Sequence, residues 1–337
     1  MHAVVLRGVG PSKSLQLETV DDPQAGPGDV VVRLEAAALN HRDVWIRKGL
    51  YAGIKFPTIL GSDGCGTVIQ VGQEVSSEWI GRSVVINPGL EWGDNPRVPG
   101  PKFRILGMPD GGTYAELVRV PAENVCDRPA YLSANEAASI PLAALTAYRA
   151  LVTRAQLKSG ETVLITGIGG GVSAFGLQIA KALGARVVAT SRSDRKLEEA
   201  SKLGADGTLN VTSGDWSKEA IKLSGGEGPD VILDSVGGET FGRALSVIRR
   251  GGRIVTYGAT TGPIDRFDIT KLFWKQVDVL GTTMGTPLEF AAMIELFERK
   301  AIRPAVARVF PLAEAGEAQE FMEGAKQFGK IVLDTRV

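Results

Sequence analysis

A strand, a glycine-rich turn, a helix and a second strand follow one another between residues 162 and 192, and this run constrains the fold more than any other. The turn contains four glycines, Gly167, Gly169, Gly170 and Gly171. Because glycine has no Cβ, backbone amides there can approach a pyrophosphate closely, and a helix from about Val172 would point its first N–H groups at the anion. Ser173 stands where the usual fingerprint ends in glycine. A glycine cluster alone can be an ordinary tight turn, but its place between an apolar strand and an apolar-periodic helix predicts dinucleotide binding.

The end of the second strand distinguishes NAD(H) from NADP(H). Folds that bind NAD place an Asp or Glu about twenty residues beyond the glycines, where it accepts hydrogen bonds from the ribose. Here the strand RVVAT ends in Ser191 and Arg192. A hydroxyl and a guanidinium match a 2′-phosphate, which a carboxylate would repel, so we predict NADP(H). For Lys196, phosphate binding and a solvated charge at the start of a helix are equal alternatives.

Hydrophobic patterning divides the 337-residue chain into three segments. Up to about residue 128, short strand-like runs are separated by Gly and Pro, which predicts a β-rich domain. Helices and strands then alternate up to about residue 284, the pattern of a doubly wound parallel sheet. From residue 285 a helical stretch, a strand-like run, a further helix and the strand KIVLDTRV close the sequence. The chain is therefore expected to be an α/β protein with two cores.

Charge and cysteine content exclude several classes of partner. The 38 basic and 38 acidic residues cancel, so no bulk attraction to nucleic acid or to an anionic membrane is expected. No apolar run approaches the length of a bilayer-spanning helix, and the first residues lack the pattern of a secretion signal. Cys65 and Cys126 are too few for a disulfide framework and are expected to be reduced thiols. We therefore expect a cytoplasmic protein with no nucleic-acid or membrane partner.

Several blocks, in order along nearly the whole chain, resemble the medium-chain dehydrogenase/reductase superfamily. Beside the glycine turn these blocks are ALNHRDVWIRKGLY (38–51), FPTILGSDGCGTVIQVG (56–72), PLAALTAYRAL (141–151), DVILDSVGG (230–238) and GKIVL (329–333). The resemblance implies a GroES-like β-rich catalytic domain made of residues 1–128 and 285–337, and a Rossmann nucleotide-binding domain made of residues 129–284. It also implies an active site in the cleft between the domains, at the carboxyl ends of the sheet strands.

The resemblance raises the question of zinc. Zinc-dependent members use an early Cys, the His and Glu of a GHE motif, and a later Cys or Asp. Here the first position is Asn40 and GHE has become GSD at 61–63. The two histidines, His2 and His41, are not in a two-histidine metal spacing, and the lobe at 86–107 has none of the cysteines that hold a structural metal. We predict neither a catalytic nor a structural zinc.

A superfamily member without a Lewis acid suits substrates in which the charge of the incoming hydride delocalises, such as quinones and α,β-unsaturated carbonyls. The string NHRDVWIRKGLY resembles zinc-free quinone oxidoreductases, in which Asn, Asp and Tyr occupy the spacing of Asn40, Asp43 and Tyr51. The resemblance implies an NADPH-dependent quinone or enone reductase, with Asn40 as the first candidate donor to the oxyanion. Asp43 is expected to orient the loop. Tyr51 is expected to donate a proton or to close the pocket, with a loop aromatic as an equal alternative, and Asp63 is expected either near the nicotinamide ribose or as a structural cap.

The remaining expectations also come from the resemblance. Further cofactor contacts fall at Thr146, Val236, Gly237, Tyr257 and Gly258. Lys330 matches a position that reaches the cofactor, with a strand-edge charge as an equal alternative. An apolar sixth strand near residues 277–282 predicts a homodimer joined at that edge. Two other functions remain open: an alcohol or aldehyde dehydrogenase, and a non-catalytic NADP-binding protein of the crystallin-like, RNA-binding or membrane-associated kind.

Overall fold

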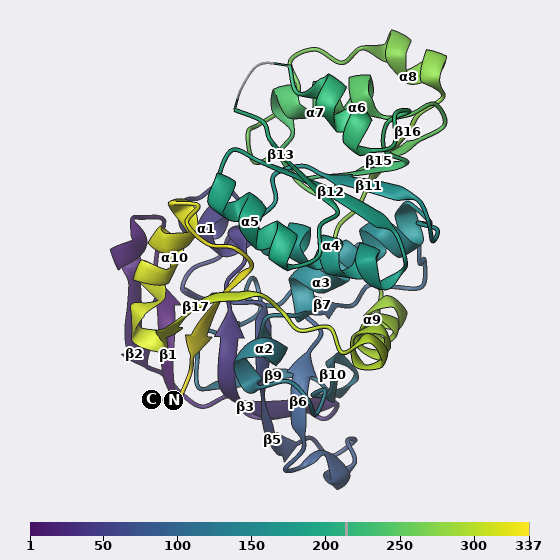
Figure 1. Ribbon diagram of the computed structural model, residues 1–337. Coiled ribbons are helices and arrows are strands. Elements are labelled where there is room, and N and C mark those ends of the chain that lie inside the picture. Colours follow the sequence, from purple (N-terminus) through teal and green to yellow (C-terminus); the bar gives the residue numbers. More distant parts are fainter. Residues whose placement is uncertain (213–214, 337) are drawn as a thin grey trace. The chain divides into compact units, whose positions relative to one another are not determined.

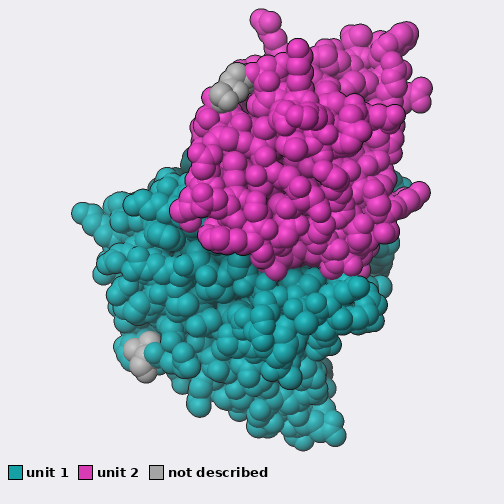
Figure 2. Space-filling model, in the orientation of Figure 1, with its two compact units in different colours: residues 1–143, 285–337 teal, residues 144–284 magenta. Residues whose placement is uncertain are grey.

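The computed structural model describes residues 1–212 and 215–336 (Figure 1). It divides into two compact units, residues 1–143 with 285–337 and residues 144–284 (Figure 2). The sequence placed the first boundary between residues 128 and 129, whereas here the first unit continues to Ala143. The reason is that residues 131–136 bind the C-terminal part of that unit. The Tyr131 hydroxyl lies 2.8 Å from the Ile302 carbonyl, and Arg303 donates to Glu136 over 2.7 Å.

The first unit is built around a mixed sheet into which the C-terminal strand is inserted. Its order is β10 (Val125–Asp127), β6 (Ser83–Ile86), β5 (Asp63–Val71), β3 (Asp29–Ala38), β18 (Lys330–Asp334) and β17 (Val306–Pro311), with β9 (Leu117–Pro121) also pairing with β3. Strand β18 runs antiparallel to β3 and parallel to β17. A smaller sheet has the order β2 (Leu15–Thr19), β1 (His2–Leu6) and β4 (Thr58–Ile59), and β7 (Gly89–Leu90) pairs with β8 (Arg104–Ile105). The start of β18 therefore lies beside the end of β3.

Short helices close this unit, and their sequences account for where they begin. They are α1 (His41–Arg47), α2 (Ala134–Ala138), α9 (Pro287–Lys300) and α10 (Ala315–Glu323), while α3 (Pro141–Tyr148) begins in the unit and ends beyond it. Ser133 and Thr286 form capping boxes with Glu136 and Glu289, so side chains satisfy N–H groups that the helices leave without partners. Helix α1 packs with the apolar cluster of Leu39, Ile46 and Tyr114.

The second unit contains a sheet in which every pair of neighbouring strands is parallel, as the sequence predicted. Its order is β13 (Gly207–Asn210), β12 (Arg186–Ser191), β11 (Thr162–Ile165), β14 (Val231–Asp234), β15 (Arg253–Thr256) and β16 (Asp278–Gly281). The strand order reverses beside β11, which makes the carboxyl ends of β11 and β14 the switch point of a doubly wound fold. Figure 1 shows α4 (Gly171–Ala182) and α5 (Asp194–Lys202) on one face, and α6 (Ser217–Leu223) and α7 (Gly238–Val247) on the other. Helix α8 (Ile269–Lys275) precedes β16.

Candidate active site

The first group of candidate residues surrounds the N-terminus of α1. Asn40 leaves β3 in an extended conformation, and its backbone N–H donates to Asp43 Oδ2 over 2.8 Å. In return the Asp43 N–H donates to the Asn40 carbonyl over 3.0 Å. Tyr114 donates its hydroxyl to the same Asp43 oxygen over 3.0 Å. Asp43 therefore holds the turn that presents Asn40, which fits the orienting role expected for it.

Burial controls the protonation of this Asp43–Tyr114 pair. Both residues are fully buried, and burial raises the pKa of Asp43, opposed by the charge of Arg42 and by the hydrogen bonds from Asn40 and Tyr114. Burial, and then the charge of Asp43, raise the pKa of Tyr114 well above its usual value. The phenol therefore remains a donor at neutral pH. Asp43 Oδ1 has no hydrogen-bond partner among the described residues.

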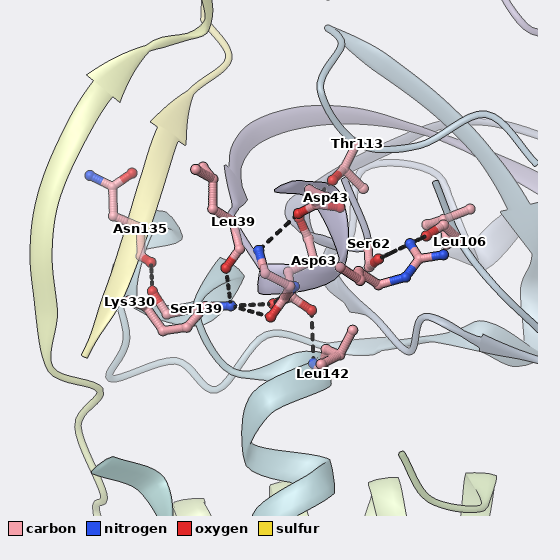
Figure 3. Close-up of polar contacts among 12 residues, drawn as sticks. Leu39, Asp43, Ser62, Asp63, Leu106, Thr113, Asn135, Ser139, Leu142 and Lys330 are labelled. Atoms are coloured by element: carbon pink, nitrogen blue, oxygen red, sulfur yellow. Dashed lines mark hydrogen bonds and ion pairs between the residues drawn. The ribbon is translucent and has the colours of Figure 1, made fainter. Parts of the chain in front are cut away.

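A buried ion pair lies next to this turn (Figure 3). Asp63, the first residue of β5, receives Lys330 Nζ and Asn40 Nδ2 on its Oδ2 atom, over 2.7 and 2.9 Å. Its Oδ1 accepts the backbone N–H of Leu142 over 2.8 Å, in the first turn of α3. The carboxylate thus caps α3, one of the two positions expected for it. Lys330 also donates to Asn40 Oδ1 and to the Leu39 carbonyl, over 2.8 and 2.7 Å.

This arrangement excludes one of the two roles considered for Lys330. Strand β18 lies between β3 and β17, so Lys330 is no strand-edge charge, and only 3% of its side chain is exposed. Its three ammonium hydrogens have three acceptors in the first unit. The predicted contact of Lys330 with the cofactor stays a prediction.

Tyr51 belongs to a different part of the first unit. It follows α1, and the guanidinium carbon of Arg42 lies 5.2 Å from the centroid of its ring. Tyr51 and Arg42 line a pocket of about 260 Å³ together with Phe103 and Met108. Within the part of the chain that the structure describes, no hydrogen bond joins Tyr51 to the Asn40–Asp63–Lys330 cluster. Its assignment as a catalytic residue stays a prediction.

The donor chemistry at the positions of the zinc ligands does not fit zinc. Asn40 contributes an amide, Ser62 a hydroxyl that donates to the Leu106 carbonyl, and Asp63 a carboxylate bound to an ammonium. Zinc in proteins is held by thiolates, imidazoles and carboxylates whose lone pairs face the ion. Among the described residues no group of three or more His, Cys, Asp or Glu side chains could hold a metal ion. The absence of zinc stays a prediction that this chemistry supports.

The second group of candidate residues lies at the switch point of the parallel sheet and fits a dinucleotide. Gly167 and Gly169 have φ angles of +65° and +132°, which other residues adopt only with strain. A Cβ on Gly167 would lie 2.7 Å from Val236 Cγ2, so the turn after β11 packs closely on the loop after β14. Gly170 is the N-cap of α4, which begins at Gly171 and Val172. The predicted strand, turn and helix are present, with the helix N-terminus available to a pyrophosphate.

Ser173 explains how the turn keeps its shape without a final glycine. Its Oγ accepts the Gly169 N–H over 3.2 Å and donates to the Gly170 carbonyl over 3.0 Å. The side chain is 2% exposed and faces the turn rather than solvent. The substitution therefore leaves the packing of α4 on the sheet intact.

Three candidate residues for the 2′-phosphate lie near the end of β12. Ser191 is the last residue of β12, Arg192 is exposed, and Lys196 lies on α5 over the turn, with Nζ 3.0 Å from where a Cβ of Gly169 would be. Burial, and then the charge of Arg195, lower the pKa of Lys196. No described carboxylate pairs with Arg192 or Lys196. Arg192 and Lys196 are therefore candidates to bind an additional phosphate, such as the 2′-phosphate of NADP(H), beside the pyrophosphate at the turn.

Asp234 organises the other side of the switch point and was not identified from the sequence. It ends β14, accepts the Thr166 hydroxyl over 2.5 Å and accepts the Gly237 N–H over 3.1 Å. Gly237, at φ +72°, begins the turn into α7. The Tyr257 N–H donates to the Asp234 carbonyl over 3.1 Å, which sets the start of the loop after β15 that contains Gly258. A carboxyl group at the end of a buried strand was the signal that could have revealed Asp234.

Thr146 and Arg42 complete the candidate residues. Thr146 is buried on α3 in the second unit. Arg42, also missed by sequence reasoning, is 8% exposed and donates to Ser62 Oγ and to the Leu106 carbonyl, each over 2.8 Å. A basic residue beside the Asn40 position was the only local signal, and its partners lie 20 and 64 positions away.

Comparison with known proteins accounts for both units. Residues 26–130 match the family model of the alcohol dehydrogenase GroES-like domain, and residues 171–299 match that of the zinc-binding dehydrogenase. The chain is 37% identical to a zinc-type alcohol dehydrogenase-like protein of Leptosphaeria maculans, covering 95% of this chain and 94% of that one.

Two solved structures are similar over nearly the whole chain. One is an NAD-dependent alcohol dehydrogenase, with a TM-score of 0.95, 40% identity and 99% of both chains covered. The other is a 2-octenoyl-CoA carboxylase reductase in complex with NADP and 2-octenoyl-CoA, with a TM-score of 0.88 and 30% identity, covering 100% of this chain and 88% of that one. With both units matched, the chain belongs to the medium-chain dehydrogenase/reductase superfamily and consists of a GroES-like domain and a Rossmann domain.

Proposed function

We propose that this protein is an NADPH-dependent, zinc-independent reductase that transfers a hydride to an α,β-unsaturated carbonyl compound, with quinones as a second class of acceptor. The observation that carries the proposal is the Asn40–Asp63–Lys330 cluster: Asn40 and Asp63 stand at positions of the zinc ligands, and Asp63 is bound to the Lys330 ammonium instead of facing a metal ion. The similar carboxylase reductase bound to NADP and 2-octenoyl-CoA favours an enoyl thioester or enone over a quinone.

The reaction requires the protein mainly to position substrate and cofactor and to stabilise the negative charge that develops on the carbonyl oxygen. When bound at the glycine turn, NADPH would supply the hydride and be oxidised to NADP⁺. The hydride electrons form the new C–H bond at the β-carbon, and the C=C electron pair moves toward the carbonyl oxygen to give an enolate. A proton from water then completes the α-carbon. Asn40 provides an amide N–H for the enolate oxygen, and burial strengthens such a donor.

Preference for NADPH follows from the end of β12. Ser191 offers a hydroxyl in place of the acid that NAD-binding folds use, and Arg192 and Lys196 have no described carboxylate partner. A 2′-phosphate would give these cations an anion. The same cations contribute little to the binding of NADH, which lacks that phosphate.

Alcohol dehydrogenation and non-catalytic NADP binding are the two alternatives to this function. An alcohol dehydrogenase is favoured by the similar NAD-dependent alcohol dehydrogenase structure, and it would need a Lewis acid that the donor set here does not fit. A non-catalytic NADP-binding protein would need only the second unit. The buried polar cluster of the first unit is costly to maintain without a chemical role, and it favours catalysis.

The proposal also covers the location, partners and assembly of the protein. No helix of the described residues is long and apolar enough to cross a membrane. We infer a cytoplasmic enzyme that takes a small-molecule substrate and has no nucleic-acid partner, since its basic and acidic residues cancel. We also infer a homodimer joined at β16, whose outer edge pairs with no described strand.

The test is a titration of purified protein with NADPH and NADH, after its metal content has been measured and any metal removed with a chelator. NADPH oxidation is then followed with an enoyl thioester, an enone, a quinone and an aldehyde. Tight NADPH binding and metal-free reduction of the enoyl compounds are expected. Stoichiometric zinc with alcohol oxidation would establish the dehydrogenase instead, and binding without turnover would establish the non-catalytic alternative.

A further inference from the structure

Lys330 is a buried cation whose donors are all used within the first unit. Its ammonium lies 2.7 Å from the Leu39 carbonyl, 2.8 Å from Asn40 Oδ1 and 2.7 Å from Asp63 Oδ2. An ammonium has three hydrogens and no lone pair, so these three acceptors satisfy it. Figure 3 shows the Leu39 and Asp63 acceptors converging on the end of the Lys330 side chain. In this arrangement each of the three hydrogens is directed at an acceptor of the protein.

The ion pair fixes the orientation of the Asn40 amide. The Lys330 ammonium can only donate, so the amide oxygen must face it. The ionised Asp63 can only accept, so the amide nitrogen must face the carboxylate. A flipped amide would place N–H against the ammonium and oxygen against the carboxylate, and both contacts would be repulsive. One of the two Nδ2 hydrogens then binds Asp63, and the other has no partner among the described residues.

From this geometry we propose that Lys330 is a positioning residue of the reductase: it acts through Asn40, turning and polarising the amide so that its second N–H receives the substrate oxyanion. The inference rests on the proposed function. In this arrangement a fixed ammonium supplies the positive charge that relatives with zinc obtain from the metal, and Asp63 connects that charge to the nitrogen of the donating amide. Hydrogen bonds in a buried network of this kind polarise and strengthen one another.

The simpler alternative is that Lys330 only neutralises a carboxylate that caps α3. Removal of one partner of a buried ion pair is destabilising because the other charge stays behind, whereas replacement of both can be neutral. A variant that removes both charges therefore separates the two roles. Lys330→Met with Asp63→Asn leaves no unpaired charge, so it is expected to fold, and it lacks the ammonium that orients Asn40.

The kinetic experiment compares Lys330→Met, Lys330→Met with Asp63→Asn, Asn40→Ala, and Lys330→Met with Asn40→Ala. Lys300→Met, at the exposed end of α9, is the matched control. We expect Lys330→Met to lower kcat by on the order of 100-fold, the size of an effect on one oxyanion donor, with the NADPH dissociation constant unchanged within about twofold. The kcat should not recover when Asp63→Asn is added to Lys330→Met. The decrease in kcat for Lys330→Met with Asn40→Ala should be no larger than that for Asn40→Ala alone, since the two residues act as one unit.

Other results would overturn the proposal. Wild-type kcat in Lys330→Met, or recovery in the charge-free double variant, would reduce Lys330 to an ion-pair partner. A raised NADPH dissociation constant with unchanged kcat would make it a cofactor ligand. Additive losses in Lys330→Met with Asn40→Ala would show that it does not act through Asn40.

A spectroscopic experiment tests the same proposal without turnover. In protein labelled with ¹⁵N at asparagine, the Asn40 side-chain amide is assigned by its loss in Asn40→Ala. Its two hydrogens should be well separated in chemical shift and slow to exchange, and both properties should be lost in Lys330→Met. Unchanged amide signals would refute the positioning role. Should the wild-type protein reduce none of the substrates, the proposed function fails, and this measurement still decides the role of Lys330.

Discussion

The candidate site residues of both units gather at the ends of strands. Ser191 ends β12 and Asp234 ends β14, while Asn40 follows β3 and Lys330 begins β18. At these positions the backbone leaves the sheet, so a side chain can point along the strand axis instead of into a packed face. The two strand ends of the Rossmann domain lie at the carboxyl edge of the parallel sheet, and those of the GroES-like domain meet in one buried cluster.

The choice between NADPH and NADH can be tested at Ser191 and Arg192. Ser191→Asp combined with Arg192→Ala removes two phosphate donors and adds the acid that NAD-binding folds use. Because hydrogen bonds to charged groups contribute about 1.5–3 kcal/mol each, the NADPH dissociation constant should rise on the order of 100-fold. Calorimetric titration with both cofactors measures the change.

The NADH dissociation constant serves as the internal reference in this experiment, and it should move by less than about threefold because NADH has no 2′-phosphate. Lys218→Ala, which removes an exposed charge on α6, should change neither constant. Equal losses for both cofactors would show that Ser191 and Arg192 do not bind the phosphate.

The candidate residues differ in how far they could be predicted from the sequence. The glycines, Ser191 and Arg192 lie within one strand-turn-helix-strand run, so their spacing alone brings them together. Lys330 binds a carboxylate 267 positions earlier in the chain, and nothing near it in the sequence marks this partner. Contacts between distant positions depend on which strands pair, and strand pairing is the part of a mixed sheet that local patterning leaves open.

At the scale of elements, the same distinction separates the two domains. In the Rossmann domain each strand precedes a helix, so order and orientation follow from a repeated local unit and could be predicted. In the GroES-like domain β18 inserts between β3 and β17, and residues 131–136 bind residues 297–303, which moved the boundary to Ala143. Both features come from long-range packing that no local pattern encodes.

The N-terminus of α1 gives a prediction with a defined pH dependence. Tyr114→Phe keeps the buried ring and removes the hydroxyl that donates to Asp43. Loss of one hydrogen bond to a buried charged group should lower the free energy of unfolding by about 1–3 kcal/mol at neutral pH. Denaturant titration at several pH values measures this loss, with Tyr131→Phe on the half-buried Tyr131 as the matched control.

The sign of the pH dependence follows from the pKa of Asp43. Burial raises this pKa, so the Asp43 contribution to stability is largest at low pH and is lost as the pH rises through the raised value. The Tyr114 hydroxyl opposes the shift by favouring the carboxylate, so Tyr114→Phe raises the pKa further. The decrease in the free energy of unfolding caused by Tyr114→Phe should therefore be largest at pH values above the Asp43 pKa and smaller below it. A loss of equal size at every pH would show that Asp43 does not titrate over the range measured.

At the scale of the whole molecule, several exposed apolar side chains lie together on the Rossmann domain, along its edge strand and the preceding helix. Val279 on β16, and Phe273 and Trp274 on α8, are 40%, 59% and 69% exposed. An unpaired strand edge beside exposed aromatic side chains is costly for a monomer in water. A second copy of the chain, pairing through the same edge, would cover both features.

The assembly prediction is tested at this edge. Val279→Lys combined with Trp274→Glu should convert the protein from dimer to monomer, because it places charges where two copies would have to exclude water. Sedimentation velocity measures the mass in solution. Leu288→Glu removes a more exposed apolar side chain from α9 and should leave the dimer intact. A dimer that persists in the double variant would place the interface elsewhere.

The insertion of β18 has a consequence for how the protein is made. A ribosome releases residues 144–284 as one continuous stretch, so the Rossmann domain can fold while the rest of the chain is still being translated. The GroES-like domain must wait for residues 330–334, which lie inside its sheet, and the lysine that holds its polar cluster belongs to that last strand. A chain that stops before residue 330 would therefore lack both an inner strand of the GroES-like sheet and the lysine of its buried cluster, while its Rossmann domain would be complete.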